Sequence, residues 1–242
     1  MKLDYLFIDW PYIASALLCL GITGRYLLTR EQMAFVKAKL PESRLVFGGS
    51  KLWRISLILL FVGHLAGLVF PREILLWNGN PIRLYVLESF AFVVGILALA
   101  GWAALTWRHL EQSTGSVAAE FTDTIFLACL FVGLASGLLM AVLYRWGSFW
   151  GTMTLTPYAL SLLRGKPMPG FAMQMPFLVR LHIVSAFMAV ALVPLTRLAP
   201  FLVLGLHRCI ELMGRPATVI GHAAAAWMQR HNPGAWIWPE ED

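Results

Sequence analysis

Residues 124–144 read TIFLACLFVGLASGLLMAVLY, an apolar stretch without a charged residue. At 1.5 Å per residue, a helix of this length crosses the roughly 30 Å hydrocarbon core of a membrane. Four more apolar stretches are long enough to do the same, at residues 6–28, 52–70, 84–106 and 177–204. We therefore predict an all-α integral membrane protein, a bundle of five transmembrane helices.

The composition of the 242 residues supports this class, with 59% hydrophobic and 13% charged residues. A soluble domain carries about 25% charged residues, and a disordered chain needs low hydrophobicity. We expect a transmembrane domain at 1–204 and a cytoplasmic tail at 205–242. Because the spans leave no room for a large soluble catalytic domain, demanding chemistry would need a bound cofactor or a partner chain.

The net charge of +6 is spread over the segments between the spans. Twelve of the 19 basic residues fall in or beside the first connection, the third connection and the C-terminal tail. By the positive-inside rule, these segments face the cytoplasm and the N-terminus lies outside, in a bacterial-type inner (plasma) membrane. The basic residues are then topology signals, with lipid rather than nucleic acid as the surrounding partner.

The connections differ in character. Residues 29–51 form a basic segment, residues 71–83 form a turn-rich loop with two prolines and a glycine, and residues 107–123 are short and mixed. Residues 145–176 form the longest connection, in which 158–163 predict a short interfacial helix.

Two histidines lie well inside predicted spans, His64 in the second and His182 in the fifth. His64 stands seven residues before Pro71 and His182 six residues after Pro176, so both lie about 10 Å below the outer boundary. Two histidines at equal depth can ligate one haem iron from opposite faces, as in a b-type cytochrome. Alternatively, each is a lone intramembrane histidine bonded to a nearby carbonyl or hydroxyl. The remaining histidines, His109, His207, His222 and His231, are expected to be solvated or interfacial.

Charged residues gather near the same boundary. Arg72, Arg83 and Arg180 either bind haem propionates or anchor the helices in the interface. Glu88 lies about one turn into the third span. It is either a proton acceptor for quinol or a buried partner of one of the arginines Arg83 and Arg180.

Several short motifs resemble the gamma subunit of respiratory nitrate reductase, a membrane cytochrome b. They are residues 9–14 (DWPYIA) with 25–26 (RY), residues 61–64 (FVGH) with Pro71, and residues 180–182 (RLH) followed by 194–198 (PLTRL). The resemblance implies five spans, an outside N-terminus, quinol oxidation near an outer haem, and cytoplasmic iron–sulfur and molybdenum subunits as partners. It assigns the outer haem ligands to His64 and His182.

The same resemblance implies an inner ligand pair ten residues before His64 and eighteen after His182. Arg54 and Pro200 occupy those positions, and neither side chain can ligate iron. We therefore expect one haem b. The outer-loop lysine of the family's quinol site is not apparent, and Tyr85 occupies roughly its place, which makes Tyr85 and Glu88 the candidate quinone-site residues.

The leading hypothesis is a mono-haem cytochrome b subunit that anchors a redox complex and exchanges electrons between quinone and a partner. The partner is a set of catalytic subunits or, since the haem lies on the outer side, an electron carrier at the outer face. The alternative is a haem-free membrane anchor or assembly subunit.

Overall fold

The computed structural model describes residues 4–47, 51–111, 117–213 and 227. Within them, the regular structure is helical and no strand occurs. Five stretches are long and apolar enough to cross a membrane: Asp9–Leu40, Lys51–Val69, Pro81–Glu111, Phe121–Leu143 and Phe177–Leu195. The prediction of an all-α fold with five membrane-spanning helices is confirmed.

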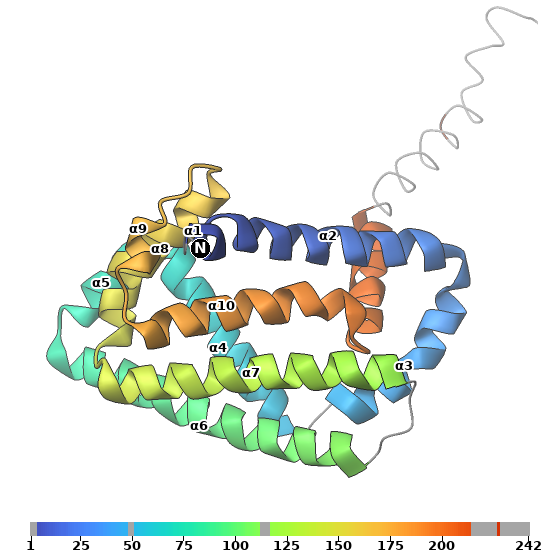
Figure 1. Ribbon diagram of the computed structural model, residues 1–242, viewed down its shortest axis with the longest axis horizontal. Helices are drawn as coiled ribbons and strands as arrows, with labels where there is room; N and C mark the ends of the chain where they lie inside the picture. Colours follow the sequence, from blue (N-terminus) through green and yellow to red (C-terminus); the bar gives the residue numbers. More distant parts are fainter. Residues whose placement is uncertain (1–3, 48–50, 112–116, 214–226, 228–242) are drawn as a thin grey trace, which may run out of the picture.

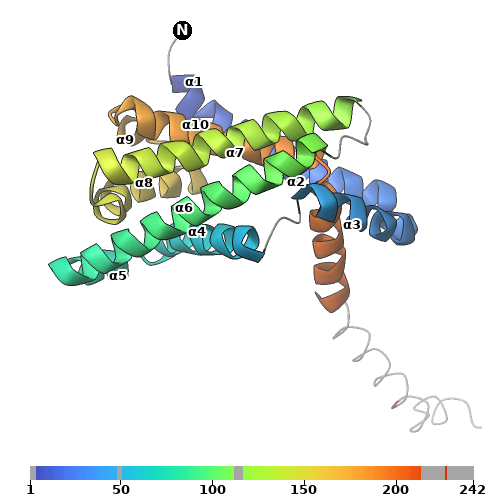
Figure 2. The same ribbon diagram turned by 90° about the horizontal axis from the view of Figure 1, so that it is seen from below.

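The spans are carried by five long helices: α2 (Asp9–Thr29), α4 (Lys51–Val69), α6 (Pro81–Glu111), α7 (Val117–Leu143) and α10 (Phe177–Leu192). Helix α10 packs between α7 and α2, and α6 packs between α4 and α7 (Figures 1 and 2). We name the end of the bundle where α2, α6 and α10 begin the N-terminal end, and the other the opposite end.

Four further helices gather at the N-terminal end: α1 (Asp4–Phe7), α5 (Pro71–Asn78), α8 (Gly147–Leu163) and α9 (Gly170–Met173) (Figure 1). The prediction of a turn-rich loop over 71–83 is wrong, because α5 fills most of it. Pro71 starts this helix at a position that needs no backbone N–H, and Glu73 lies in its first turn, where a carboxylate complements the helix dipole.

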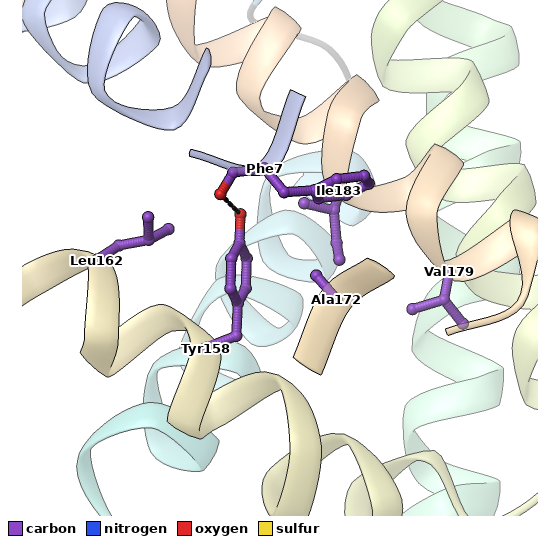
Figure 3. Close-up of a cluster of buried hydrophobic side chains, with 6 residues drawn as sticks. All are labelled: Phe7, Tyr158, Leu162, Ala172, Val179 and Ile183. Atoms are coloured by element: carbon purple, nitrogen blue, oxygen red, sulfur yellow. Dashed lines mark hydrogen bonds between the residues drawn. The ribbon is translucent and has the colours of Figure 1, made fainter. Parts of the chain in front are cut away.

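Helix α8 also exceeds the expected short helix at 158–163, since it begins eleven residues earlier, at Gly147. It packs through Tyr158 and Leu162 into a buried cluster with Phe7, Ala172, Val179 and Ile183 (Figure 3). The Tyr158 hydroxyl donates to the Phe7 carbonyl at 2.8 Å. The cluster therefore fixes the first half of α10, the part that carries His182.

At the opposite end, the basic first connection is also helical. A short 3₁₀ turn, η1 (Arg30–Gln32), leads into α3 (Met33–Phe47). Met33 and Val36 of α3 pack with Ile22 of α2 and with Ala199 and Val203.

The prediction of one continuous fifth span over 177–204 is wrong. Helix α10 ends at Leu192, a 3₁₀ turn η2 (Val193–Leu195) follows, and the chain is helical again over 199–213 in a different direction (Figure 2). Pro194 explains the break, because proline lacks the N–H that would continue the helix. The predicted tail at 205–242 starts within this last helix, and most of it lies outside the described residues.

A candidate cofactor site between α4 and α10

The imidazole rings of His64 on α4 and His182 on α10 lie side by side, with His64 exposed and His182 half-buried. Their centres are 6.2 Å apart and their planes are inclined by 16°. Among the described residues, the other histidine in a ring contact is His207, and its neighbour is Tyr26 rather than a second histidine. The matched depth inferred from the sequence is therefore accompanied by matched position in space.

Hydrogen bonds determine which ring nitrogen of each histidine is protonated. His64 Nδ1 lies 2.7 Å from the Leu60 carbonyl oxygen, and His182 Nδ1 lies 2.9 Å from the Gly133 carbonyl oxygen. A carbonyl oxygen can only accept, so Nδ1 must carry the proton in both rings. Each Nε2 then keeps a lone pair, the arrangement found in metal-ligating histidines whose other nitrogen donates to a carbonyl.

The separation of the rings fits a haem iron between them. Iron–nitrogen bonds of about 2 Å on opposite faces of a haem put the ring centres roughly 6 Å apart. Within the described residues, no group of three or more His, Cys, Asp or Glu side chains could hold a metal ion. A pair of axial ligands completed by a macrocycle is thus the coordination that these residues can offer.

The three arginines all come to the N-terminal end of the bundle, but in different settings. Arg83 lies over the Trp77 ring, with its guanidinium carbon 5.2 Å from the ring centre. Arg72 is exposed on α5. Arg180 is half-buried, and its Nε is buried without a hydrogen-bond partner. Of the three arginines, it is therefore the one with an unsatisfied buried donor that an anionic group could accept from.

Within the described contacts, Glu88 accepts a hydrogen bond from the start of α8 and forms no ion pair with an arginine. Its Oε1 accepts the Ser148 backbone N–H at 2.7 Å, so the carboxylate satisfies one of the free N–H groups of that helix. Ser148 Oγ in turn accepts from Asn78 Nδ2 at 3.0 Å. Tyr85 is exposed and meets Trp146 edge to face, with ring centres 4.8 Å apart. The two predicted quinone-site residues thus lie at a junction of α5, α6 and α8.

An open apolar groove of about 540 Å³ lies between α5 and α8 at the same end. It is lined by Pro71, Arg72, Leu75, Leu76, Thr152, Met153, Thr156, Pro157 and Leu160. Thr156 Oγ1 donates to the Gly67 carbonyl at 3.0 Å, and Gly67 is less than one helical turn from His64. The groove is therefore connected through Thr156 to the part of α4 that carries His64, and the sequence alone did not indicate it.

The opposite half of the bundle is closed by packing. Trp53, Leu105, Phe126, Leu127 and Ala189 form a buried cluster. A Cβ on Gly101 would lie only 2.9 Å from Trp53 Cβ, so α4 and α6 touch closely there. Arg54 follows Trp53 and is exposed, and Pro200 lies beyond the break in α10.

Several polar residues at that end were not anticipated as structural elements. Asp123 is fully buried and accepts from both the backbone N–H and the Nε–H of Arg197. His109, expected to be solvated or interfacial, is only 7% exposed, and its Nε2 lies 3.2 Å from Thr124 Oγ1. The solvated alternative is wrong, because α6 runs to Glu111 and carries His109 into the contact with α7.

Among the described residues, His207 contacts Glu211 rather than the pair. His207 is half-buried and lies 3.3 Å from Glu211 through its Nε2. His222 and His231 lie outside the described residues.

Fold and site together define a polytopic helical membrane protein with two intramembrane histidines paired across the bundle. The family described as the nitrate reductase gamma subunit matches residues 4–216, and the chain belongs to that family. The resemblance found in its motifs is confirmed.

Individual relatives are similar at low identity. The respiratory nitrate reductase 2 gamma chain of Escherichia coli (strain K12) is 28% identical over 215 residues, covering 82% of this chain and 92% of that protein. The nitrate reductase gamma chain of Bacillus subtilis (strain 168) is 24% identical over 191 residues, with coverages of 78% and 86%. The nitrate reductase-like protein NarX of Mycobacterium tuberculosis (strain ATCC 25618 / H37Rv) is 23% identical over 198 residues, which are 78% of this chain but 30% of that protein.

Proposed function

We propose that the chain is the membrane-anchoring cytochrome b subunit of a respiratory nitrate reductase-type complex. It exchanges electrons between the quinone pool and a partner subunit through one b haem held by His64 and His182. The observation that carries the proposal is the pair of nearly parallel imidazoles 6.2 Å apart, each with Nδ1 bonded to a carbonyl. A bound b haem supplies one-electron transfer within the membrane.

Two observations support a single haem. Arg54 and Pro200 stand where the family resemblance calls for a second pair of ligands. The packed cluster around Trp53, with its close approach to Gly101, fills the bundle beside that position. Close-packed side chains leave no cavity for a macrocycle.

Arg180 is the best candidate to bind a haem propionate. Its buried Nε has no partner, and a buried N–H without an acceptor costs about 1–3 kcal/mol. A propionate carboxylate would remove that cost through a charge-assisted hydrogen bond. Arg72 and Arg83 are placed at the same end and serve as further candidates.

The groove between α5 and α8 is the site we propose for the quinone. Its lining is predominantly apolar, as a quinone ring and tail require. Thr156 in this lining bonds to the Gly67 carbonyl, and Gly67 lies less than one helical turn from His64. Glu88 is linked to it through Ser148, because the Ser148 backbone N–H donates to Glu88 Oε1 and the Ser148 carbonyl accepts from Thr152 Oγ1 of the groove at 2.7 Å. Quinol oxidation releases two electrons and two protons. The electrons would pass to the haem one after the other, the Glu88 oxygen not used by Ser148 would receive one proton, and the other proton would go to water at the open groove.

The orientation proposed from the basic residues puts the histidine pair in the outer half of the membrane. Iron–sulfur and molybdenum subunits on the cytoplasmic side are the partners suggested by the family, and an electron carrier at the outer face is the alternative that this depth favours. The orientation is tested by labelling single cysteines, introduced at exposed Tyr5 or Leu212 into a variant of the chain without its own cysteines. The labelling is done on intact cells. We expect an impermeant reagent to react at Tyr5→Cys alone.

A reduced-minus-oxidised absorption spectrum of the purified full chain tests the haem. We expect a b-type band with about one haem per chain, lost in both His64→Ala and His182→Ala. His109→Ala is the control, since it removes another hydrogen-bonded histidine of the bundle and should keep the band. Absence of haem from the unaltered chain would favour the haem-free anchor, and full haem in His182→Ala would refute the ligand assignment.

The quinone site is tested by filling the groove. Met153 lines it and is exposed, whereas Leu163 is exposed on the same helix outside it. We expect Met153→Trp to slow reduction of the haem by a quinol at least tenfold while reduction by dithionite is unchanged, and Leu163→Trp to have no effect. Equal rates in the two variants would refute this location.

A further inference from the structure

Helix α7 supplies no histidine to the pair, yet it makes the cross-helix contacts to the His182 ring. Gly133, Ser136 and Gly137 lie on one face of α7, because residues three and four apart are neighbours on a helix. His182 Nδ1 lies 2.9 Å from the Gly133 carbonyl and 3.1 Å from Ser136 Oγ. We name these three residues the α7 notch.

The Ser136 hydroxyl has a defined role in these contacts. It donates its hydrogen to the Gly133 carbonyl at 3.0 Å, which leaves its oxygen lone pairs for the Nδ1–H of His182. Ser136 is only 2% exposed, so water does not replace it. The imidazole N–H thus has two acceptors, both from α7.

Gly137 provides the space for the ring. A Cβ at this position would lie 3.3 Å from His182 Cε1 and 3.6 Å from Nδ1. The first distance is shorter than an ordinary van der Waals contact, so any side chain would push the ring. Gly133 differs, because a Cβ there would meet Ser185 Oγ at an ordinary 3.6 Å.

His64 is held in another way. Its Nδ1 bonds to the Leu60 carbonyl one turn back on its own helix, and a Cβ on the neighbouring Gly63 would meet nothing within 4 Å. The two histidines are therefore supported unequally, one by its own helix and one by α7.

We infer that Ser136 and Gly137 are positioning residues, which set the orientation and donor strength of His182 as an iron ligand. The inference rests on the proposed function. Hydrogen bonding to the far nitrogen of a ligating histidine raises its basicity and tunes the metal. The α7 notch would then adjust one axial ligand independently of the other.

A redox titration of the haem band in purified full-length variants tests the role of Ser136. Removing one acceptor of the Nδ1–H weakens donation to iron and disfavours the ferric state, so Ser136→Ala should raise the midpoint potential. Ser185→Ala is the matched control: Ser185 is also buried, but its hydroxyl donates to the backbone carbonyl of His182 rather than contacting the ring. Equal midpoint potentials in Ser136→Ala and the unaltered chain would overturn the inference.

Electron paramagnetic resonance of the ferric haem tests Gly137, because the low-spin signal depends on the relative orientation of the two imidazole planes. Gly137→Ala should shift this signal or lose the haem, while Gly24→Ala on α2, where a Cβ would meet nothing within 4 Å, leaves both unchanged. An unchanged signal in Gly137→Ala would overturn the steric part of the inference. Failure of the proposed function is distinguishable, since the unaltered chain would then contain no haem at all.

Discussion

The buried ion pair between Asp123 and Arg197 should be one of the strongest single contributions to the stability of the bundle. Asp123 is fully buried at the start of the fourth span, and the Arg197 side chain is 11% exposed. The carboxylate accepts the Arg197 backbone N–H at 3.1 Å and its Nε–H. It therefore ties α7 to the chain directly after the break in α10, where Thr122 also donates to the Leu195 carbonyl.

Asp123→Ala would leave a nearly buried guanidinium and a backbone N–H without their acceptor. Removing one partner of a buried pair costs about 3–5 kcal/mol. Asp123→Asn keeps an oxygen for the backbone N–H and should cost less, about 1–3 kcal/mol. The free energy of unfolding can be measured by titrating mixed micelles with SDS and following helix content by circular dichroism.

Glu211→Gln is the control, because the pair of Glu211 with His207 is solvent-accessible, with the Glu211 side chain 54% exposed. Such pairs contribute about 0–1 kcal/mol. A loss below about 1 kcal/mol in Asp123→Ala, equal to that of the control, would refute the view that burial makes this pair structurally important.

Two further substitutions probe packing and the cap at the N-terminal end. Gly101→Ala places a Cβ 2.9 Å from Trp53 Cβ and should lower the free energy of unfolding by about 1–3 kcal/mol. Gly24→Ala is the control, because a Cβ there would meet nothing within 4 Å, and it should not lower this free energy. Similar free energies of unfolding in the two variants would contradict the close contact. Tyr158→Phe loses the bond to the Phe7 carbonyl and should cost about 1 kcal/mol at neutral pH. Burial, with a smaller effect of Tyr12, raises the pKa of Tyr158, so the folded chain keeps a proton that the unfolded chain releases above a pH of about 10. The free energy of unfolding of the unaltered chain should therefore fall as the pH rises above about 10. In Tyr158→Phe, which lacks this proton, the fall should be smaller.

Hydropathy and helix length were sufficient to predict the five spans, because a membrane imposes a minimum apolar length on each crossing. The proximity of His64 and His182 was predictable for a related reason. Two helices that cross the same layer have a common depth scale, so counting residues from Pro71 and Pro176 aligned the two rings.

Elements whose structure depends on tertiary contacts were missed. Residues 71–78 were read as a loop because of their proline and the following glycine, but Pro71 starts α5 and α8 packs against it. The break at Pro194 was overlooked because the surrounding residues are uniformly apolar. Hydropathy alone does not distinguish a continuous helix from one that ends and turns.

The supporting polar residues could not be identified from one sequence. Ser136 is a lone serine in an apolar span, and serines in helices commonly bond only to a carbonyl of the preceding turn, as Ser136 does to Gly133. Its second partner, His182 Nδ1, comes from the neighbouring α10. The burial of Asp123 likewise follows from the position of Arg197, 74 residues further along the chain.

The cap of short helices at the N-terminal end has a consequence for sequence divergence. Three of its long-range hydrogen bonds run from the side chains of Tyr12, Tyr158 and Thr156 to main-chain carbonyls of Leu162, Phe7 and Gly67. Every residue type offers a main-chain carbonyl, so the acceptor positions can change identity without losing these bonds, provided that packing is kept. In these three bonds only the residue with the hydroxyl donor is constrained. Substitutions at the acceptor positions can therefore accumulate while the arrangement of the helices at this end is kept.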